Sequence, residues 1–352
     1  MMKKQDDRRW RVQAGAIRAA ALALFLILGG MIYALGDLPL AHTETVELGG
    51  IENLSINYGH HTVILRESET ADLVLKEYMN RDNPRYYARI SRSGGTVQIQ
   101  RGRRPLFFWN WKVKVEIYLP RSFQGNLRLS NSSGSLSADV DLLDYRSIDV
   151  NVNSGTVFLK NISGGSVSVH VASGEMDIGA LGGNSFVSVS SGRLRIGSIT
   201  GEENRVKVSS GRLRIGALEG HGILELSSGN MAIDRVRGRV EVDISSGGLE
   251  LGDFSGKGAF NISSGNLTLD LRDLEGDLHF LLSSGRVDVT IPKAIPFNLD
   301  MVTRSGTVRV KEGLEEVLKI SGNSTVLRPI GPSPERTIFA RTTSGDLTIN
   351  RR

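Results

Sequence analysis

The sequence contains no cysteine, and aromatic residues make up only 6% of its 352 residues. The absence of thiols excludes disulfide bonds, thiolate metal sites, a cysteine nucleophile and a lipidated N-terminal cysteine. Histidine is also scarce: there are six, and the pair His60-His61 has no third ligand at a metal-binding spacing. We therefore expect neither a metal site nor a cofactor. Glycine is abundant, with 41 residues, and the hydrophobic content is ordinary at 39%, which favours many turns between short strands.

Positive charge is concentrated at the N-terminus. The whole chain has 43 Lys and Arg against 38 Asp and Glu, a formal net charge of +5. Residues 1–18 alone carry a net charge of +4, from Lys3, Lys4, Arg8, Arg9, Arg11 and Arg18 against Asp6 and Asp7. The remaining chain is nearly neutral, so it lacks the clustered positive surface that binds phosphate backbones. We expect no nucleic-acid partner.

A hydrophobic run lies within and after this basic segment. Residues 14–36 form an apolar stretch of 23 residues whose only charged side chain is Arg18, and about 20 residues span the hydrocarbon of a bilayer. We predict a transmembrane anchor at 14–36 and a cytoplasmic basic tail at 1–13, because basic residues stay on the cytoplasmic side. The rest of the chain then lies outside the bacterial cytoplasmic membrane, in the periplasm or at the cell surface. The alternative is a secreted protein whose signal peptide is cleaved near Gly36.

One tripeptide recurs through the rest of the chain. Ser-Ser-Gly, or a close variant of it, is repeated every 18 to 21 residues over most of the sequence. Its glycines are Gly134, Gly155, Gly174, Gly192, Gly211, Gly229, Gly247, Gly265, Gly285, Gly306 and, near the C-terminus, Gly345. A period of this length is typical of repeat architectures in which each unit is stable only when it is stacked on its neighbours.

Apolar and polar residues alternate on both sides of each Ser-Ser-Gly. Val187 and Val189 precede Gly192, and Leu194 and Ile196 follow it, which is the pattern of half-buried strands. We predict a β-solenoid of about 18–21 residues per coil with a continuous aliphatic core. The glycine is expected to supply a positive φ at the corner, and the serines to bond the turn and form a ladder between coils. A structural role thus accounts for the tripeptide without a catalytic serine.

The predicted fold class is therefore all-β: a single-chain β-helix, or β-solenoid, preceded by one transmembrane helix. We assign residues 44–120 to irregular N-terminal coils or a cap, 121–310 to the regular Ser-Ser-Gly coils, and 311–352 to a C-terminal coil with a cap. Caps are needed because the last strands of a solenoid are unpaired on one side. The segment RTTSGDLTINRR at 341–352 is expected to be the final coil.

Three features of the sequence resemble a known family: the run KVKVEIYLP at 112–120, the ladder of Ser-Ser-Gly units and the closing TTSGDLTI at 342–349. The family is a bacterial group of β-strand-repeat proteins of unknown function that is usually labelled adhesin-like. The resemblance covers about residues 44–350. It implies a β-solenoid, often carried by a membrane-anchored envelope protein, and it supplies no catalytic residues.

Four arginines form the first candidate binding site. On two adjacent coils the outward positions after the corner are all basic: Arg193, Arg195, Arg212 and Arg214. At a spacing of about 5 Å they repel one another and would attract an anionic partner, such as a phosphate-, carboxylate- or sulfate-bearing polymer of the envelope. The alternative is a solvated face, in which Glu175 and Asp177 on the preceding coil pair with Arg193 and Arg195.

The segment RGRRPLFFWNWK at 101–112 is the second candidate. It places Trp109 and Trp111 among basic residues, and such a mixture suits a membrane interface or stacking on a sugar. The alternative is an aromatic plug that covers the N-terminal end of the rod.

These observations predict a non-enzymatic, membrane-anchored module that binds an envelope polymer or a protein partner. A second hypothesis is a structural scaffold of the envelope that associates with itself through unpaired end strands; the oligomeric state is left open. A third, weaker hypothesis is a polysaccharide-active β-helix enzyme, based only on Glu225, Asp243 and Glu250 on neighbouring coils. Coils of nearly constant length provide no long loops to wall a deep cleft, so we do not expect an enzyme.

Overall fold

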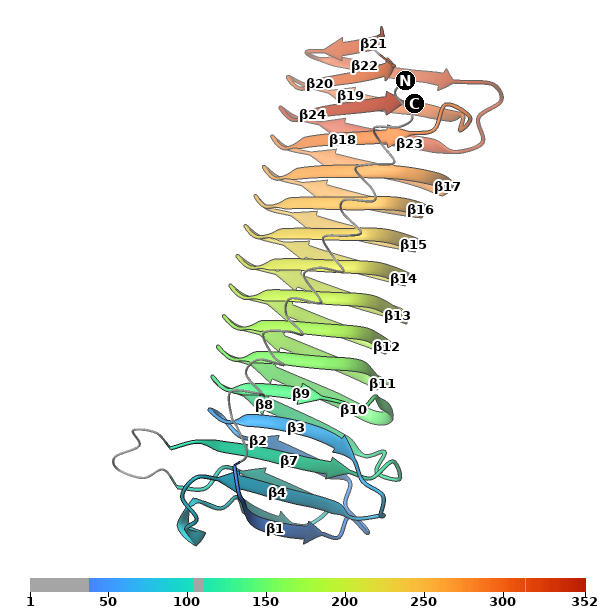
Figure 1. The fold of residues 1–352 in the computed structure, drawn as a ribbon. Coiled ribbons are helices and arrows are strands. Elements are labelled where there is room, and N and C mark those ends of the chain that lie inside the picture. Colours follow the sequence, from blue (N-terminus) through green and yellow to red (C-terminus); the bar gives the residue numbers. More distant parts are fainter. Residues whose placement is uncertain (1–37, 104–110, 314) are drawn as a thin grey trace, which may run out of the picture.

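The computed structural model describes residues 38–103, 111–313 and 315–352. In these ranges the protein is built from strands, with one short 3-10 turn and no α-helix. The strands stack into a rod, with β1 (Leu40–Val46) at one end and β21 (Glu315–Ser321) at the other (Figure 1). The predicted tail and anchor fall outside the described residues. Within the described residues, no helix has the length and apolar character needed to cross a membrane.

The N-terminal end of the rod is an irregular cap. Its elements are β1, β2 (Asn53–Asn57), β3 (Thr62–Glu67), β4 (Leu73–Met79), η1 (Pro84–Tyr86), β5 (Arg89–Ser93), β6 (Thr96–Gln100), β7 (Val113–Leu119), β8 (Asn126–Asn131) and β9 (Ser135–Ala138). The coil of β2 and β3 lies between the coil of β6 and β7 and the coil of β8 and β9. Further out, β4 runs antiparallel to β7, β1 to β4, and β5 to β6. The regular parallel stack therefore ends in antiparallel strands.

The middle of the rod consists of parallel coils in register. Its strands are β10 (Leu142–Val152), β11 (Thr156–Val171), β12 (Glu175–Val189), β13 (Arg193–Val208), β14 (Arg212–Leu226), β15 (Asn230–Ile244), β16 (Gly248–Ile262) and β17 (Asn266–Leu282). Each strand bends around its coil and pairs with the equivalent strand of the next. Thr156, Glu175, Arg193, Arg212 and Asn230, which follow successive corner glycines, are register partners in turn. The predicted solenoid is confirmed.

The C-terminal end departs from the order of the sequence. Its strands are β18 (Arg286–Ile291), β19 (Phe297–Thr303), β20 (Thr307–Glu312), β21, β22 (Ser324–Ile330), β23 (Thr337–Thr342) and β24 (Asp346–Arg351). β24 lies between β18 and β20, and β23 lies between β17 and β19. The last coil of the sequence is thus inserted below β19 and β20 and is not the final layer that we expected. β21 and β22, antiparallel to β20 and β19, form the outermost layer.

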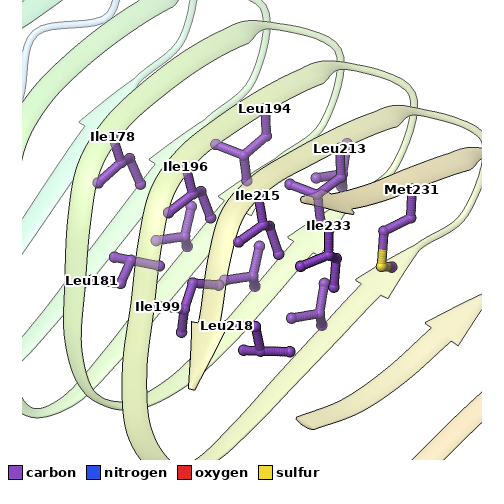
Figure 2. Packing of buried hydrophobic residues seen from close by; sticks show 14 of the residues in the cluster. Ile178, Leu181, Leu194, Ile196, Ile199, Leu213, Ile215, Leu218, Met231 and Ile233 are labelled. Carbon is purple, nitrogen blue, oxygen red and sulfur yellow. The ribbon is translucent and has the colours of Figure 1, made fainter. Parts of the chain in front are cut away.

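The alternating apolar residues form the core. Leu194 and Ile196 are 0% and 3% exposed, and equivalent residues of successive coils stack in columns, as Ile196 does between Ile178 and Ile215 (Figure 2). Each such side chain contributes about 1.5–3 kcal/mol when it is fully buried. The residues between them point outward, so every coil presents a row of variable side chains to solvent.

The corner glycines are required for space, not for an unusual backbone conformation. None of the Ser-Ser-Gly glycines is among the described residues with positive φ, so that part of the prediction was wrong. A Cβ atom on Gly192 would lie 2.4 Å from the carbonyl oxygen of Gly174, and one on Gly229 would lie 2.4 Å from that of Gly211. Because the coils are separated by one strand spacing, the backbone of one corner leaves no room for a side chain on the next.

A second corner of each coil has its own glycine column, which the sequence-based prediction missed. Its members follow the corner glycines by nine residues and are Gly164, Gly183, Gly201, Gly220, Gly238 and Gly256. A positive φ does occur here, for example 102° at Gly220 and 121° at Gly238. A Cβ atom on Gly256 would lie 1.8 Å from the carbonyl oxygen of Gly238. This column therefore combines both reasons for glycine, left-handed backbone and close stacking.

The predicted serine ladder is present in the later coils. The hydroxyl of Ser246 donates to the carbonyl oxygen of Ser227 at 3.0 Å, and that of Ser264 donates to Ser245 at 3.0 Å. Each bond joins one corner to the corner below it. The serine hydroxyls thus add a second bond to carbonyl oxygens that already accept the amide of the next corner.

Candidate functional site

A groove follows the Ser-Ser-Gly corners of the middle coils. It has a volume of about 520 Å³ and is lined by the Ser-Gly pairs of four successive corners and by Thr156, Glu175, Arg193, Arg212 and Asn230. The last five residues occupy the same position on successive coils, so they form one row beside the hydroxyls. Hydroxyl, amide and guanidinium groups can all hydrogen-bond a polar ligand. The groove is therefore chemically suited to a sugar hydroxyl or an anionic group.

The four predicted arginines lie side by side next to this groove. Arg193 is the register partner of Arg212, and Arg195 is the register partner of Arg214. The side chains of Arg193, Arg195 and Arg214 are between 42% and 45% exposed. Arg193 and Arg212 line the groove itself, whereas Arg195 and Arg214 form the next row outward from the corner.

Carboxylates on the preceding coil neutralise the first pair of arginines. Arg193 donates to Oε1 of Glu175 at 3.0 Å, and Arg195 donates to Glu175 at 3.3 Å and to Asp177 at 3.4 Å. Burial raises the pKa of Asp177, and the neighbouring Arg195 offsets this effect only in part. The sequence-based alternative, in which Glu175 and Asp177 pair with the arginines, therefore holds for Arg193 and Arg195.

The second pair is less completely neutralised. Arg214 donates to the two carboxylate oxygens of Asp234 at 2.9 and 3.2 Å, a partner on the following coil that the sequence analysis overlooked. Arg212 has no carboxylate within ion-pairing distance among the described residues. The groove therefore contains one guanidinium group, that of Arg212, that is available to an external anion.

The structure describes part of the aromatic candidate segment. Trp109 lies outside the described residues, while Trp111 is half-buried and packs against the core. Its ring contacts Tyr86 and His61, with centroid distances of 5.4 and 5.2 Å. Its indole nitrogen has no hydrogen-bond partner among the described residues. Trp111 thus packs inside the N-terminal cap, between the 3-10 turn and the His61 corner.

His60 and His61 occupy a corner of the N-terminal cap. The ring of His60 bonds the Ser133 hydroxyl, and a Cβ atom on Gly134 would meet the backbone of His61, which places His61 in the glycine column. Burial, and then the charge of Arg101, lowers the pKa of His61 to about 4. Among the described residues, no three potential ligands come together to hold a metal ion.

The three carboxylates considered for catalysis do not converge. Glu225 pairs with Arg205 at 3.1 Å and with Lys207 at 3.3 Å, and Asp243 accepts from the Asn261 amide at 3.0 Å. Glu225 and Asp243 lie on the strand segment before the corner, whereas Glu250 lies after it. Glu225 and Asp243 are register partners on the same side of the corner, but each is bonded to neighbouring side chains and Glu250 lies on the other side, so the three do not form one catalytic site.

An unpredicted arginine cluster surrounds Asp253 on the far side of the coils. The carboxylate accepts from Arg237 at 3.0 Å, from Arg235 at 3.2 Å and from Arg272 at 3.4 Å. Partial burial opposes ionisation, but the bonds from Arg237 and Arg235 lower the pKa of Asp253 overall. Because these residues belong to β15, β16 and β17, the cluster ties three coils together. In the sequence, this cluster is indicated only by acidic and basic residues that are about one coil length apart.

Solved structures that match the chain do so at low identity. A proposed adhesin from Parabacteroides merdae is 12% identical, with a TM-score of 0.34 over 90% of this chain and 98% of that one. A proposed cell adhesion protein from Clostridium sporogenes is 13% identical, with a TM-score of 0.25 over 88% and 98%. A proposed lipid binding protein from Parabacteroides distasonis is 13% identical, with a TM-score of 0.34 over 88% and 96%. At these values we transfer no function from them.

One protein family covers nearly the whole rod. The Toastrack DUF4097 family matches residues 51–234 and, in an overlapping second match, residues 187–350. No curated protein matches this chain. The two matches together span the Ser-Ser-Gly coils on which the resemblance to an adhesin-like repeat family was based, and they confirm it. The chain belongs to the Toastrack DUF4097 family.

Proposed function

We propose that this solenoid is a non-enzymatic binding module that holds an anionic polymer of the bacterial envelope along its Ser-Ser-Gly corners. The observation that carries the proposal is the groove itself, which sets the guanidinium of Arg212, unpaired among the described residues, beside Arg193 and a column of serine hydroxyls. A single exposed ion pair contributes little to affinity. A polymer that contacts the same groups on several coils gains affinity through multivalency.

The proposed setting is extracytoplasmic. The basic tail at 1–13 and the apolar run at 14–36 support an anchor that holds the rod outside the cytoplasmic membrane. A rod of stacked coils then extends the groove away from the anchored end. This geometry suits contact with a polymer layer rather than with a small soluble substrate.

The test is co-sedimentation of the full-length chain with purified cell-wall and outer-envelope fractions over a series of salt concentrations. The double variant R193Q/R212Q removes both groove arginines, and R81Q/R328Q removes two exposed arginines that lie away from the Ser-Ser-Gly corners as a charge-matched control. We expect salt-sensitive binding that R193Q/R212Q weakens at least fivefold and the control retains. Equal binding by both variants would exclude the groove as the site.

A self-associating scaffold is the second candidate, and the ends of the rod favour it. In the part of the chain that the structure describes, β1, β5, β21 and β22 each pair with a neighbour on one side only. Val317 on β21 is 42% exposed and Leu327 on β22 is 76% exposed. Unpaired edge strands can bind further strands. Analytical ultracentrifugation of the wild type and of V317K/L327K distinguishes this role, since a scaffold would lose its higher oligomers in the variant.

A further inference from the structure

A second polar hollow lies at the N-terminal end of the rod, away from the groove. It has a volume of about 540 Å³ and is lined by Asn57, Arg89, Gln100, Arg101, Gly102 and Arg103. Ligand sites in proteins commonly have volumes of this order. The lining residues come from the end of β2, the start of β5, the end of β6 and the three residues that follow β6. Gln100 is the register partner of both Asn57 and Arg89.

The backbone that presents two of these arginines is fixed on both sides. The amide of Arg101 donates to the carbonyl oxygen of Asn57 at 3.2 Å, and the amide of Arg103 donates to that of Arg85 at 3.1 Å. Between them, a Cβ atom on Gly102 would lie 2.2 Å from the carbonyl oxygens of Tyr86 and Tyr87. The segment is therefore packed closely against the 3-10 turn. The backbone of Arg101 and Arg103 is thus held in place before any ligand binds.

The side chains that line the hollow are basic or neutral. Three of its lining side chains are guanidinium groups, and none is a carboxylate. Among the described residues, no Asp or Glu lies within ion-pairing distance of Arg89, Arg101 or Arg103, in contrast to the ion pairs of Arg193 and Arg195. The charge of Arg101 also acts on nearby His61, where it adds to the effect of burial and lowers the pKa of the ring.

Several guanidinium groups that line one hollow are suited to binding phosphate. Each presents planar donors that match phosphate oxygens, often in pairs. The amide side chains of Asn57 and Gln100, on the same wall, can donate to hydroxyl or ester oxygens beside the phosphate. The chemistry of the hollow thus fits a phosphate that carries a polar substituent.

The location of the hollow points to the source of that phosphate. The turn behind it contacts β1, because the Tyr87 hydroxyl donates to the carbonyl oxygen of Ala41 at 3.2 Å and the Tyr87 ring stacks on His42 at 4.2 Å. β1 begins at Leu40, four residues after the apolar run 14–36 ends. If this run is the anchor, the hollow lies at the end of the rod nearest to the membrane.

We infer that the hollow lined by Arg89, Arg101 and Arg103 binds the phosphate of anionic lipid headgroups, such as phosphatidylglycerol, in the leaflet from which the rod emerges. This inference rests on the proposed anchor but not on the polymer groove. Binding would dock the base of the rod on the membrane surface and fix its orientation there. A zwitterionic headgroup would bind more weakly, because its cationic choline would face the same three arginines.

The experiment is isothermal titration of the full-length chain in a nonionic maltoside detergent. The probes are dihexanoyl phosphatidylglycerol, dihexanoyl phosphatidylcholine and glycerol 3-phosphate. The variant R89Q/R101Q/R103Q removes the site, and R286Q/R304Q/R328Q removes three arginines outside the hollow as the control. Thermal unfolding of each variant, followed by circular dichroism, checks that the fold is retained. Partition of the lipids into the detergent affects all variants equally, so differences between variants report on the site.

We expect the wild type and the control to bind phosphatidylglycerol at least tenfold more tightly than the site variant, and more tightly than phosphatidylcholine. Equal affinity of the folded site variant would overturn the inference. Equal affinity of the wild type for the two lipids would overturn it as well. Glycerol 3-phosphate binding as tight as that of phosphatidylglycerol would show a site for free phosphate esters and exclude the lipid assignment. None of these outcomes depends on the polymer test, so the two proposals can fail separately.

Discussion

A Cβ atom on Gly306 would lie 2.1 Å from the carbonyl oxygen of Gly345, although the strands β20, β21, β22 and β23 lie between these glycines along the chain. A Cβ atom on Gly345 would in turn lie 2.7 Å from the carbonyl oxygen of Gly285. The column of corner glycines thus runs from Gly285 through Gly345 to Gly306. The C-terminus is built into the stack, where strands pair with it on both sides, and the antiparallel pair β21 and β22 remains to cover the end.

The substitution G306A tests this stacking. We expect it to destabilise the protein by about 3 kcal/mol, because the new methyl group would overlap backbone that cannot move aside without separating two coils. Chemical denaturation measures the change. G49A is the control, since a Cβ atom on Gly49 meets nothing within 4 Å, and its effect should stay within about 0.5 kcal/mol. Equal stability of the two variants would contradict the proposed packing.

Removal of one whole coil should preserve the fold. Deleting residues 193–211 joins Gly192 to Arg212, which is the register partner of Arg193, so Arg212 and Arg214 would take the places beside Glu175 and Asp177. Because solenoid coils contact only their neighbours, we expect a shorter rod that still unfolds cooperatively, with a lower midpoint. Deleting only residues 193–200 shifts the register and should abolish cooperative unfolding in circular dichroism. If both deletion variants unfold with the same cooperativity, the register between coils does not determine whether the rod folds.

The arginine cluster around Asp253 predicts a charge-dependent loss of stability. Asn tolerates the positive φ of 40° at this position, so D253N removes the charge and leaves the backbone unchanged. We expect a loss of about 1 kcal/mol at neutral pH, since three like charges lose their common partner. Folding lowers the pKa of Asp253. The ionised carboxylate therefore stabilises the fold fully above the unfolded-state pKa, and this stabilisation is lost as the pH falls through the folded-state pKa. The difference between D253N and the wild type should therefore shrink in acid; a pH-independent difference would point to a steric cause.

Glu77 predicts the opposite dependence on pH. This carboxyl group on β4 points into the core, is 1% exposed and accepts a hydrogen bond from the Ala88 amide at 2.9 Å. Burial raises its pKa to about 7. The folded state then binds more protons than the unfolded state between about pH 4.5 and pH 7, so this residue lowers stability as the pH rises through that window.

The variant E77Q keeps an acceptor for Ala88 and removes the charge. We expect E77Q to exceed the wild type in stability by about 3 kcal/mol at pH 8.5 and to match it near pH 4. Denaturation midpoints across this range provide the measurement. The lowered pKa of His61 makes stability rise with pH, opposite to the effect of Glu77. The stability difference between E77Q and the wild type isolates Glu77, whereas the wild-type pH dependence combines both groups. E47Q, at an exposed position on the same end, should show no such trend.

The regular coils could be predicted because the local alternation of apolar residues and the longer Ser-Ser-Gly period specify the same structure. Val187, Val189, Leu194 and Ile196 alternate with polar residues at the strand period, and the Ser-Ser-Gly period sets the length of the coil. The register followed from these periods alone, and with it the juxtaposition of Arg193 with Arg212. Partners such as Asp234 were harder to foresee, because long side chains reach diagonally to the next coil.

The sequence by itself determined the all-β class, the period and the residues that face the core, because these depend on local alternation repeated many times. Only the tertiary structure decided the reason for the corner glycines, the insertion of β23 and β24 beneath β19 and β20, and the gathering of Arg89, Arg101 and Arg103 around one hollow. These features arise where segments distant in sequence pack together at the ends of the rod or across one strand spacing. Periodicity carries no information about such contacts, since it is set within each repeat and not between unlike segments.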